Sequence, residues 1–322
     1  MARTPAAPVL AAVDVGSSAA RLSIVALRGG RFEPLWFHRY PVRLGAGAFA
    51  AGGDRLLPAP LIERLLQAAR DMRRRCREFG VVARSAVATS AMREASNGAE
   101  VAARFGRAFG APLKVIDGEE EARLGRAALT HALEAAGEAL PARAVLLDLG
   151  GGSLELATAD GQRRDSLPLG AVRLLSALPT LGGPLAADAL AAPTAAVRQR
   201  VHDAFAGSRF SERGRWRGAP LVGTGGNLEI MARLLPAAAP APVGIDLVAA
   251  ARLMAPLAAL PVAERAARYG LRPERADLML PALLILTEVG RWLEQSFVRV
   301  PGTGIRDALL RELGLKLSAG SA

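Results

Sequence analysis

The stretch LLDLGGGSLEL, residues 146–156, is the most informative part of this sequence. An apolar run ends in Asp148, three glycines and Ser153 follow, and an alternating run that contains Glu155 comes next. Glycine is costly in a strand or turn, and it is tolerated where the backbone turns sharply or comes very close to another group. The stretch therefore predicts a strand, a tight turn and a returning strand, with a carboxylate beside the turn.

A related pattern lies near the N-terminus. Residues 13–22 read VDVGSSAARL, and they align with residues 147–156 as strand, aspartate, small turn and strand. In each half of the chain, three strand-like runs come first, and helical and strand-like runs alternate after them. This internal duplication predicts two related domains that face each other across a cleft.

The order of elements predicts the α/β class, with a mixed sheet flanked by helices in each domain. We place the first domain at residues 1–128, with the C-terminal helix at 303–318 as a candidate addition, and the second at 129–302. In open sheets of this kind, ligands bind at the ends of strands. The active site is therefore expected in the interdomain cleft, at the two turns that follow an aspartate.

Composition excludes several classes of protein. A single cysteine excludes an internal disulfide and a zinc finger. The net charge of +11 comes almost entirely from arginine, because the chain has only two lysines. This charge fits either an ordinary solvated surface or one that attracts a polyanion. Aromatic residues make up 4% of the chain, so a stacking platform for nucleic acid is not expected.

No stretch is long and apolar enough to predict a membrane span. The N-terminal apolar run breaks at Asp14, so we interpret it as a first strand rather than a signal peptide. The scarcity of cysteine favours the cytoplasm. The Pro/Ala-rich stretch at residues 236–244 is interpreted as a loop inserted in the second half.

Three glycine-containing turns suit phosphate binding, at residues 16–18, 150–153 and 223–227. Successive backbone N–H groups in a tight turn form a concave anion site, and a helix N-terminus adds partial positive charge. The usual phosphate loop is excluded, because neither lysine follows a glycine. Positive charge must then come from arginine, and Arg21 and Arg93 are the candidates because each follows a small-residue strand end.

Acidic residues supply the other half of a phosphoryl-transfer site. Asp14 and Asp148 each lie at the end of an apolar strand, and Mg²⁺ is the natural partner of a carboxylate near phosphates. Glu119, Glu120 and Glu121 open a helix, where acids also serve simply as favourable charges on the helix dipole. The pattern alone does not choose among the three glutamates. The three histidines are isolated in sequence and are interpreted as structural or surface residues.

The sequence resembles the exopolyphosphatase/guanosine pentaphosphate phosphohydrolase (Ppx/GppA) family, a branch of the actin–sugar kinase–heat-shock ATPase superfamily. The resemblance covers nearly the whole chain, and it implies two ribonuclease-H-like domains, Mg²⁺ as cofactor and hydrolysis of a terminal phosphoanhydride. It rests on seven motifs in order: AAVDVGSSAARL, ATSAMREASN, DGEEEARLG, LLDLGGGSLEL, SLPLGAVRL, LVGTGGN and GIRDALL.

The resemblance assigns roles to individual residues. Glu121 matches the water-activating base of the family, Asp148 the acid that orients water or metal, and Arg93 the arginine that holds the phosphate chain. Glu155 matches a companion acid of Asp148. We expect Mg²⁺ to be held by Asp148, Glu155 and Asp14. The expected phosphate-binding residues are Gly16, Ser17, Ser18, Arg21, Gly150, Gly151, Gly152, Ser153, Gly225 and Gly226.

The chain departs from the family pattern at four positions. The family usually has Asn and Ser where this chain has Ser18 and Ala19, and Thr where it has Leu154 and Asn227. Fewer donors in the first loop predict an altered affinity or substrate. Longer members continue into helical C-terminal domains that help to hold long polymers, so the resemblance does not assign processive degradation of long chains or a chain-length preference.

The leading hypothesis is a phosphohydrolase that removes the terminal phosphate of inorganic polyphosphate, of guanosine pentaphosphate, or of both. One alternative is an ATP-dependent kinase of small molecules with the same fold. Another is a non-catalytic sensor that binds guanosine alarmones. Neither a specific nucleic acid nor a membrane is an expected partner, and a homodimer is a candidate assembly.

Overall fold

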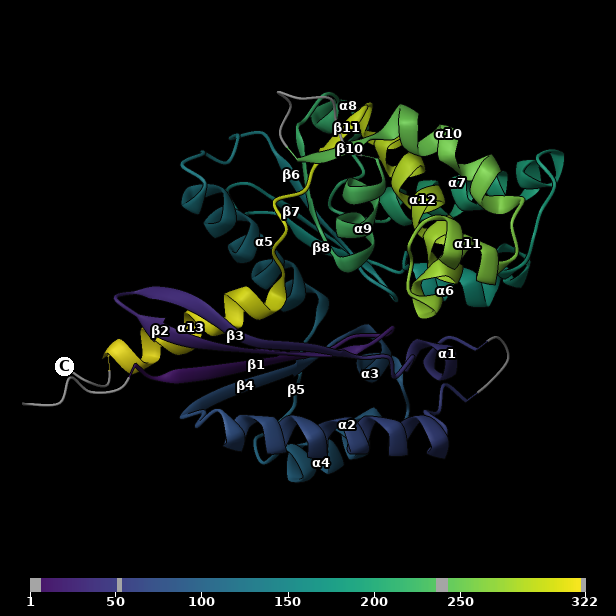
Figure 1. Ribbon diagram of the computed structural model, residues 1–322. Helices are drawn as coiled ribbons and strands as arrows, with labels where there is room; N and C mark the ends of the chain where they lie inside the picture. The colour runs from purple at the N-terminus through teal and green to yellow at the C-terminus, as the bar shows by residue number, and fades with distance from the viewer. Residues whose placement is uncertain (1–6, 51–53, 236–242, 320–322) are drawn as a thin grey trace, which may run out of the picture. The chain divides into compact units, whose positions relative to one another are not determined.

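The computed structural model describes residues 7–50, 54–235 and 243–319 (Figure 1). The chain divides into two compact units. The first unit consists of residues 1–48, 52–117 and 305–322, and the second of residues 49–51 and 118–304. None of the helices within the described ranges is long and apolar enough to cross a membrane.

The first unit contains a mixed sheet of five strands, in the order β3-β2-β1-β4-β5. The first three strands form an antiparallel meander, and β4 and β5 continue the sheet parallel to β1. The apolar run before Asp14 is therefore a buried central strand, as the sequence predicts. The strands are β1 (Val9–Val15), β2 (Ala20–Arg28), β3 (Arg31–Tyr40), β4 (Ala83–Ala88) and β5 (Lys114–Val115).

Helices cover both faces of this sheet. In Figure 1, α2 and α4 lie side by side on one face, and α13 lies on the other, against β1 and β4. Helix α2 buries one apolar stripe, including Leu65, Ala69, Met72 and Cys76, whose spacing matches the helical repeat. The helices of the unit are α1 (Gly45–Ala48), α2 (Ala59–Glu78), α3 (Ser90–Glu94), α4 (Gly98–Phe109) and α13 (Ile305–Ala319).

The second unit repeats this arrangement with one additional strand. Its sheet has the order β10-β11-β9-β6-β7-β8, in which β6, β7 and β8 form the antiparallel meander and β9 and β11 run parallel to β6. The two meanders confirm the predicted duplication. The strands are β6 (Val145–Leu149), β7 (Leu154–Thr158), β8 (Arg164–Leu167), β9 (Leu221–Thr224), β10 (Gly244–Asp246) and β11 (Phe297–Arg299).

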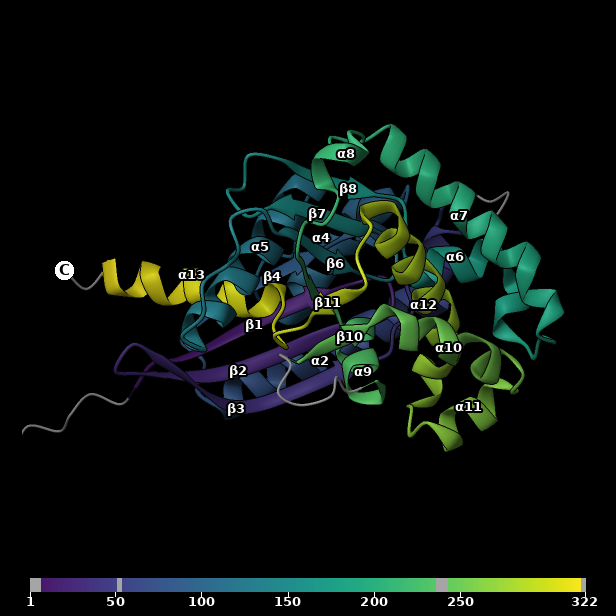
Figure 2. The ribbon, with the colours of Figure 1, turned by 90° about the horizontal axis from the view of Figure 1, so that it is seen from above.

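The helices of the second unit also lie on both faces of its sheet. Helix α5 packs on β6, β7 and β8, and most of the other helices surround α12, whose residues 278–290 are all buried (Figure 2). The helices are α5 (Gly118–Ala135), α6 (Ala171–Ala177), α7 (Ala191–Ala206), α8 (Arg213–Trp216), α9 (Gly226–Leu234), α10 (Leu247–Ala258), α11 (Val262–Arg268) and α12 (Pro273–Leu293), with 3-10 turns at Pro179–Gly182 and Asp188–Leu190.

Two details differ from the sequence interpretation. The boundary expected between residues 128 and 129 falls inside α5, whereas the compact units divide between 117 and 118, because α5 packs on the second sheet. Helix α13 belongs with the first unit. Of the loop expected at 236–244, residues 236–242 lie outside the described residues, and Gly244 already begins β10.

Candidate functional site

Asp148 and Glu155 lie directly opposite each other on the antiparallel strands β6 and β7. Side chains alternate between the two faces of a strand. On β6, Val145 and Leu147 enter the large core around α12, whereas Leu146 enters a second core beneath α5. By the same alternation, both carboxylates stand on the face that α5 covers. Glu155 is 2% exposed, so two acids share a largely buried surface.

Helix α5 comes very close to these acids because small residues line its contact with the sheet. A side chain on Gly118 would collide with Ser166 of β8, and a Cβ on Gly125 would lie 4.0 Å from the Asp148 carboxylate. Ser166 in turn donates a hydrogen bond of 2.8 Å to Glu155 Oε1. The start of α5 is thereby held against the strands that carry the acids.

The three glutamates at the start of α5 differ in their exposure and in their partners. Glu119 is an exposed partner of Arg209 at 2.7 Å, and Glu120 forms a two-point ion pair with Arg123. Glu121, in contrast, is 6% exposed. It lies one helical turn before Gly125, the residue of α5 that approaches Asp148. The residue that the resemblance assigns as the base is thus the buried one.

The turn from Gly150 to Ser153 is fastened to α6 by its carbonyl groups. The oxygens of Gly150 and Gly151 accept hydrogen bonds from the first N–H groups of α6, and Arg173 donates one of 2.6 Å to the Gly152 oxygen. A side chain on Gly170 would strike this turn. This close packing explains why glycine is needed both in the turn and at Gly170, which packs against it.

The donors of the same turn remain available. Within the described chain, no acceptor is found for the N–H groups of Gly151 and Gly152, and the buried Ser153 hydroxyl has no hydrogen-bond partner. Buried donors are normally paired, so a turn with free donors is suited to an external acceptor. An anion with several oxygens, such as a phosphate, fits this requirement.

The second glycine turn of this unit also contacts Asp148. Gly225 has a φ of +112°, and a Cβ on it would lie 2.8 Å from Asp148 Oδ1. Thr224, the β9 neighbour of Asp148, is fully buried and donates a hydrogen bond to the Thr303 oxygen. Gly226 begins α9 directly after the turn. Only glycine therefore allows the backbone to adopt this conformation beside the carboxylate.

Asn227 stands where the family usually has threonine. Its side chain is buried, and its Oδ1 accepts a hydrogen bond of 2.9 Å from Arg275 of α12. The substitution therefore ties the start of α9 to the central helix of the unit.

The first unit carries the related turn, from Gly16 to Ser18, with its hydroxyls already engaged. Ser17 Oγ lies 3.0 Å from Ser90 Oγ, and Ser18 Oγ accepts a hydrogen bond of 3.0 Å from Arg39. The Gly16 N–H bonds to the Ala19 oxygen at 3.0 Å, which closes the turn. The phosphate-binding role expected for Gly16, Ser17 and Ser18 stays a prediction.

Arg21 and Asp14 form an ion pair across β1 and β2, with 2.9 Å between Nη1 and Oδ2. Arg21 occupies the position in the first hairpin that Glu155 occupies in the second. The first turn therefore balances its own charge, whereas the second places two acids opposite each other. Phosphate binding by Arg21 and metal binding by Asp14 stay predictions, and each would compete with this ion pair.

Arg93 lies in the last turn of α3 and donates a hydrogen bond of 2.8 Å to the Ile116 oxygen, just after β5. This contact holds the half-buried guanidinium at the carboxyl ends of the parallel strands β4 and β5. Such strand ends are the usual ligand positions of open α/β sheets.

Asp148 and Glu155 suit a Mg²⁺ ion whose other ligands are waters and substrate phosphates. In the described part of the molecule, no cluster of three or more His, Cys, Asp or Glu side chains is suited to hold a metal. Mg²⁺ in phosphoryl-transfer sites, however, is held by one or two carboxylates together with waters and substrate phosphates. Asp148 and Glu155 supply such a pair, beside a cavity of about 10 Å³ that has room for about one water molecule.

Arg173 and Ser166 were not identified from the sequence. Arg173 holds the glycine turn, and its guanidinium lies 4.0 Å from the centre of the Phe49 ring. Ser166 positions Glu155. The motif SLPLGAVRL contains both residues, and its position at the end of the meander is the signal that could have identified them.

Comparisons with known proteins agree with this architecture. An exopolyphosphatase-like protein of known structure has a TM-score of 0.80 and 22% identity, covering 97% of this chain and 99% of that one. An exopolyphosphatase from Cytophaga hutchinsonii has a TM-score of 0.76 and 22% identity, covering 95% and 97%. These similarities confirm the predicted fold class, α/β with two mixed sheets flanked by helices.

Sequence comparison shows the family. A Streptomyces coelicolor protein described as uncharacterised is 35% identical over 211 residues, which are 64% of this chain but only 59% of that relative. The profile of the Ppx/GppA phosphatase family matches residues 23–317. The chain belongs to the Ppx/GppA phosphatase family.

Proposed function

We propose that the protein is a Mg²⁺-dependent phosphohydrolase that removes the terminal phosphate of inorganic polyphosphate, of guanosine pentaphosphate, or of both. One observation carries the proposal. Asp148 and Glu155 form a pair of acids beneath α5, the helix that carries the buried Glu121, and the glycine turn between the two strands has unengaged donors. Acids for a cation and a water, next to donors for phosphate oxygens, are the parts that phosphoryl transfer requires.

In the proposed reaction, Glu121 orients a water molecule and accepts its proton. The water oxygen forms a bond to the terminal phosphorus, and the bond from that phosphorus to the bridging oxygen breaks. The bridging oxygen leaves with its electron pair on the shortened chain, and orthophosphate is released. Because Glu121 is buried, its carboxylate is shielded from the bulk water that would weaken its hold on one oriented molecule.

Charge on the phosphate oxygens is balanced by fixed donors of the chain. The N–H groups of Gly151 and Gly152 and the hydroxyl of Ser153 would bind these oxygens, and Arg173 keeps the turn in place. A Mg²⁺ ion held by Asp148 and Glu155 would neutralise charge on the phosphates. Arg93 of the first unit is proposed as a further phosphate ligand, on the family pattern.

Inorganic polyphosphate and guanosine pentaphosphate share the group that the proposed chemistry needs, a terminal phosphoanhydride. Of the solved relatives described above, one is named an exopolyphosphatase and one exopolyphosphatase-like. These names favour polyphosphate as the first substrate to test.

The proposal is tested by measuring phosphate release from short polyphosphate, long polyphosphate and guanosine pentaphosphate, with and without Mg²⁺. We expect Mg²⁺-dependent release from at least one of them. Glu121→Gln should lower kcat by about 100-fold or more, as removal of a general base does. Glu119→Gln and Glu120→Gln are matched controls on the same helix turn, and both should retain activity near that of the unmodified protein.

Two results would contradict this function. One is the absence of phosphate release from all three substrates. The other is release that Glu121→Gln lowers no more than Glu120→Gln does, because the buried glutamate would then have no role in activating water.

A further inference from the structure

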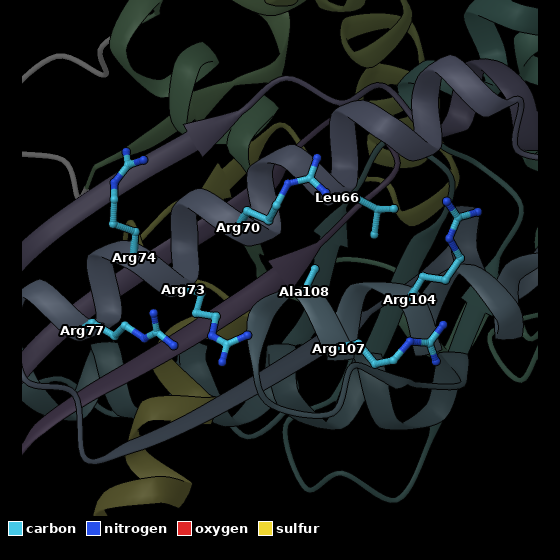
Figure 3. Close-up of a pocket in the computed structure, with 8 residues that line it drawn as sticks. All are labelled: Leu66, Arg70, Arg73, Arg74, Arg77, Arg104, Arg107 and Ala108. Carbon is cyan, nitrogen blue, oxygen red and sulfur yellow. The ribbon is translucent and has the colours of Figure 1, made fainter.

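A groove lined by arginine lies on the outer side of the helical layer of the first unit. It is an open surface hollow of about 620 Å³ between α2 and α4. Figure 3 shows Leu66 and Ala108 between the arginines of α2 and those of α4. None of its residues has a role in the proposed hydrolysis. The six arginines of this arginine groove are Arg70, Arg73, Arg74, Arg77, Arg104 and Arg107.

Nearby acids neutralise only part of the groove. Arg70 pairs with Glu63, Arg74 with Asp71 and Glu78, and Arg104 with Glu100 at 3.6 Å. Arg73, Arg77 and Arg107 have no carboxylate partner among the residues that the structure describes. Like charges placed close together repel one another, so this surplus favours an anion from outside the chain.

The spacing of the arginines suits an extended anion rather than a single ion. Arg70, Arg73 and Arg77 follow one another on successive turns of α2, and the row spans about 10 Å. Arg104 and Arg107 form a second row on α4. One phosphate ion can contact only one or two of these groups, whereas a chain of phosphates can engage several at once and gain from their linkage.

We propose that the arginine groove binds inorganic polyphosphate as an accessory site, and that it holds long chains on the protein. Guanidinium groups bind phosphate oxygens at two points, and polyphosphate offers such oxygens at every repeat. The groove has no aromatic side chain in its lining, so it lacks the stacking surface that single-stranded nucleic acid uses. The inference rests on the proposed function, because it makes polyphosphate the substrate that the groove retains.

The test uses the full chain with Glu121→Gln, so that the polymer is not consumed. Binding of long-chain polyphosphate and of tripolyphosphate is measured over a range of salt concentrations. The substitutions Arg73→Gln, Arg77→Gln and Arg107→Gln are combined in one variant. The control combines Arg200→Gln, Arg252→Gln and Arg268→Gln, which removes the same charge from exposed positions of the second unit.

The groove variant should bind long-chain polyphosphate about tenfold or more weakly. The slope of log affinity against log salt concentration should become shallower by about two, because each of the three lost phosphate contacts contributes about 0.7. Tripolyphosphate binding and the control variant should change little. Replacing the same three arginines with lysine keeps the charge but not the two-point geometry, and it should give an intermediate affinity. This lysine variant also separates loss of binding from loss of folding.

The possible results lead to distinct conclusions. If the groove variant binds long chains as tightly as the control, the accessory site is refuted. It is also refuted if duplex DNA binds the groove more tightly than polyphosphate does. If the groove arginines are needed for long-chain binding but the unmodified protein releases no phosphate, the groove is supported and the proposed hydrolysis fails.

Discussion

Asp148 and Glu155 face each other across neighbouring strands, whereas the corresponding pair in the first unit, Asp14 and Arg21, is an ion pair. Like charges opposite each other in a sheet are destabilising. A cation bound between Asp148 and Glu155 would relieve such repulsion. This contrast supports the proposal that the second hairpin, rather than the first, holds Mg²⁺.

Glu155→Gln should make the Mg²⁺-free protein more stable. We expect the free energy of unfolding to rise by about 0.5–1 kcal/mol, because one of two opposed charges is removed. The amide oxygen can still accept the hydrogen bond from Ser166. Urea unfolding measures the gain, and the stabilisation by added Mg²⁺ should disappear. Glu264→Gln, an exposed control on α11, should change neither quantity. Lower stability of the Glu155 variant without Mg²⁺ would contradict the repulsion argument.

Gly225→Ala should damage both stability and activity. The positive φ at Gly225 costs an L-residue about 1–3 kcal/mol, and the new methyl group would press on the Asp148 carboxylate. Gly302→Ala is the matched control, because it has a φ of +75° but open space around the new methyl group. It should lose stability through backbone strain while phosphate release remains. Equal loss of activity in both variants would show that the contact with Asp148 is unimportant.

Ser153→Ala should weaken substrate binding without lowering the stability of the fold. The buried hydroxyl has no partner in the described structure, so its removal should leave the free energy of unfolding unchanged or raise it by up to about 1 kcal/mol. KM for the substrate should rise about tenfold or more, because a hydrogen bond to a charged phosphate is lost. Ser208→Ala should lower the free energy of unfolding and leave KM unchanged, because the Ser208 hydroxyl donates a hydrogen bond to the Phe205 oxygen and accepts one from the Phe210 N–H. An unchanged KM in the Ser153 variant would remove this hydroxyl from the phosphate site.

Cys76 should be unreactive in the folded protein. The thiol is 1% exposed, and burial raises its pKa from 9.0 to about 11. At pH 8, iodoacetamide should therefore modify the folded chain far more slowly than the chain unfolded in urea. Rapid modification under native conditions would contradict the burial of this side chain.

The same shift predicts a dependence of stability on pH. A raised folded pKa contributes stability that is fully present below the pKa of the unfolded chain and is lost as pH rises through the folded pKa. Between about pH 9 and 11, the free energy of unfolding should fall by roughly 2–3 kcal/mol more in the unmodified protein than in Cys76→Ala. Parallel pH profiles of the two proteins would refute this contribution.

Much of the candidate site follows from local sequence. An apolar run before Asp148 and an alternating run after Ser153, with glycines between them, specify two strands and a tight turn, because side-chain spacing and backbone freedom are local properties. The choice of Glu121 over Glu119 and Glu120 came from the family resemblance alone. Each of the three is an acid in the first turn of α5, and a helix start accepts all of them.

The sequence by itself determined the repeated strand–turn–strand hairpins, the order of elements and the α/β class, since these depend on patterns within a few residues of one another. Only the tertiary structure decided which charges meet. Arg209 pairs with Glu119, Arg198 pairs with Glu288, and Arg173 reaches the glycine turn. The physical reason is that strand register and the packing of helices bring together side chains whose separation along the chain carries no local signal.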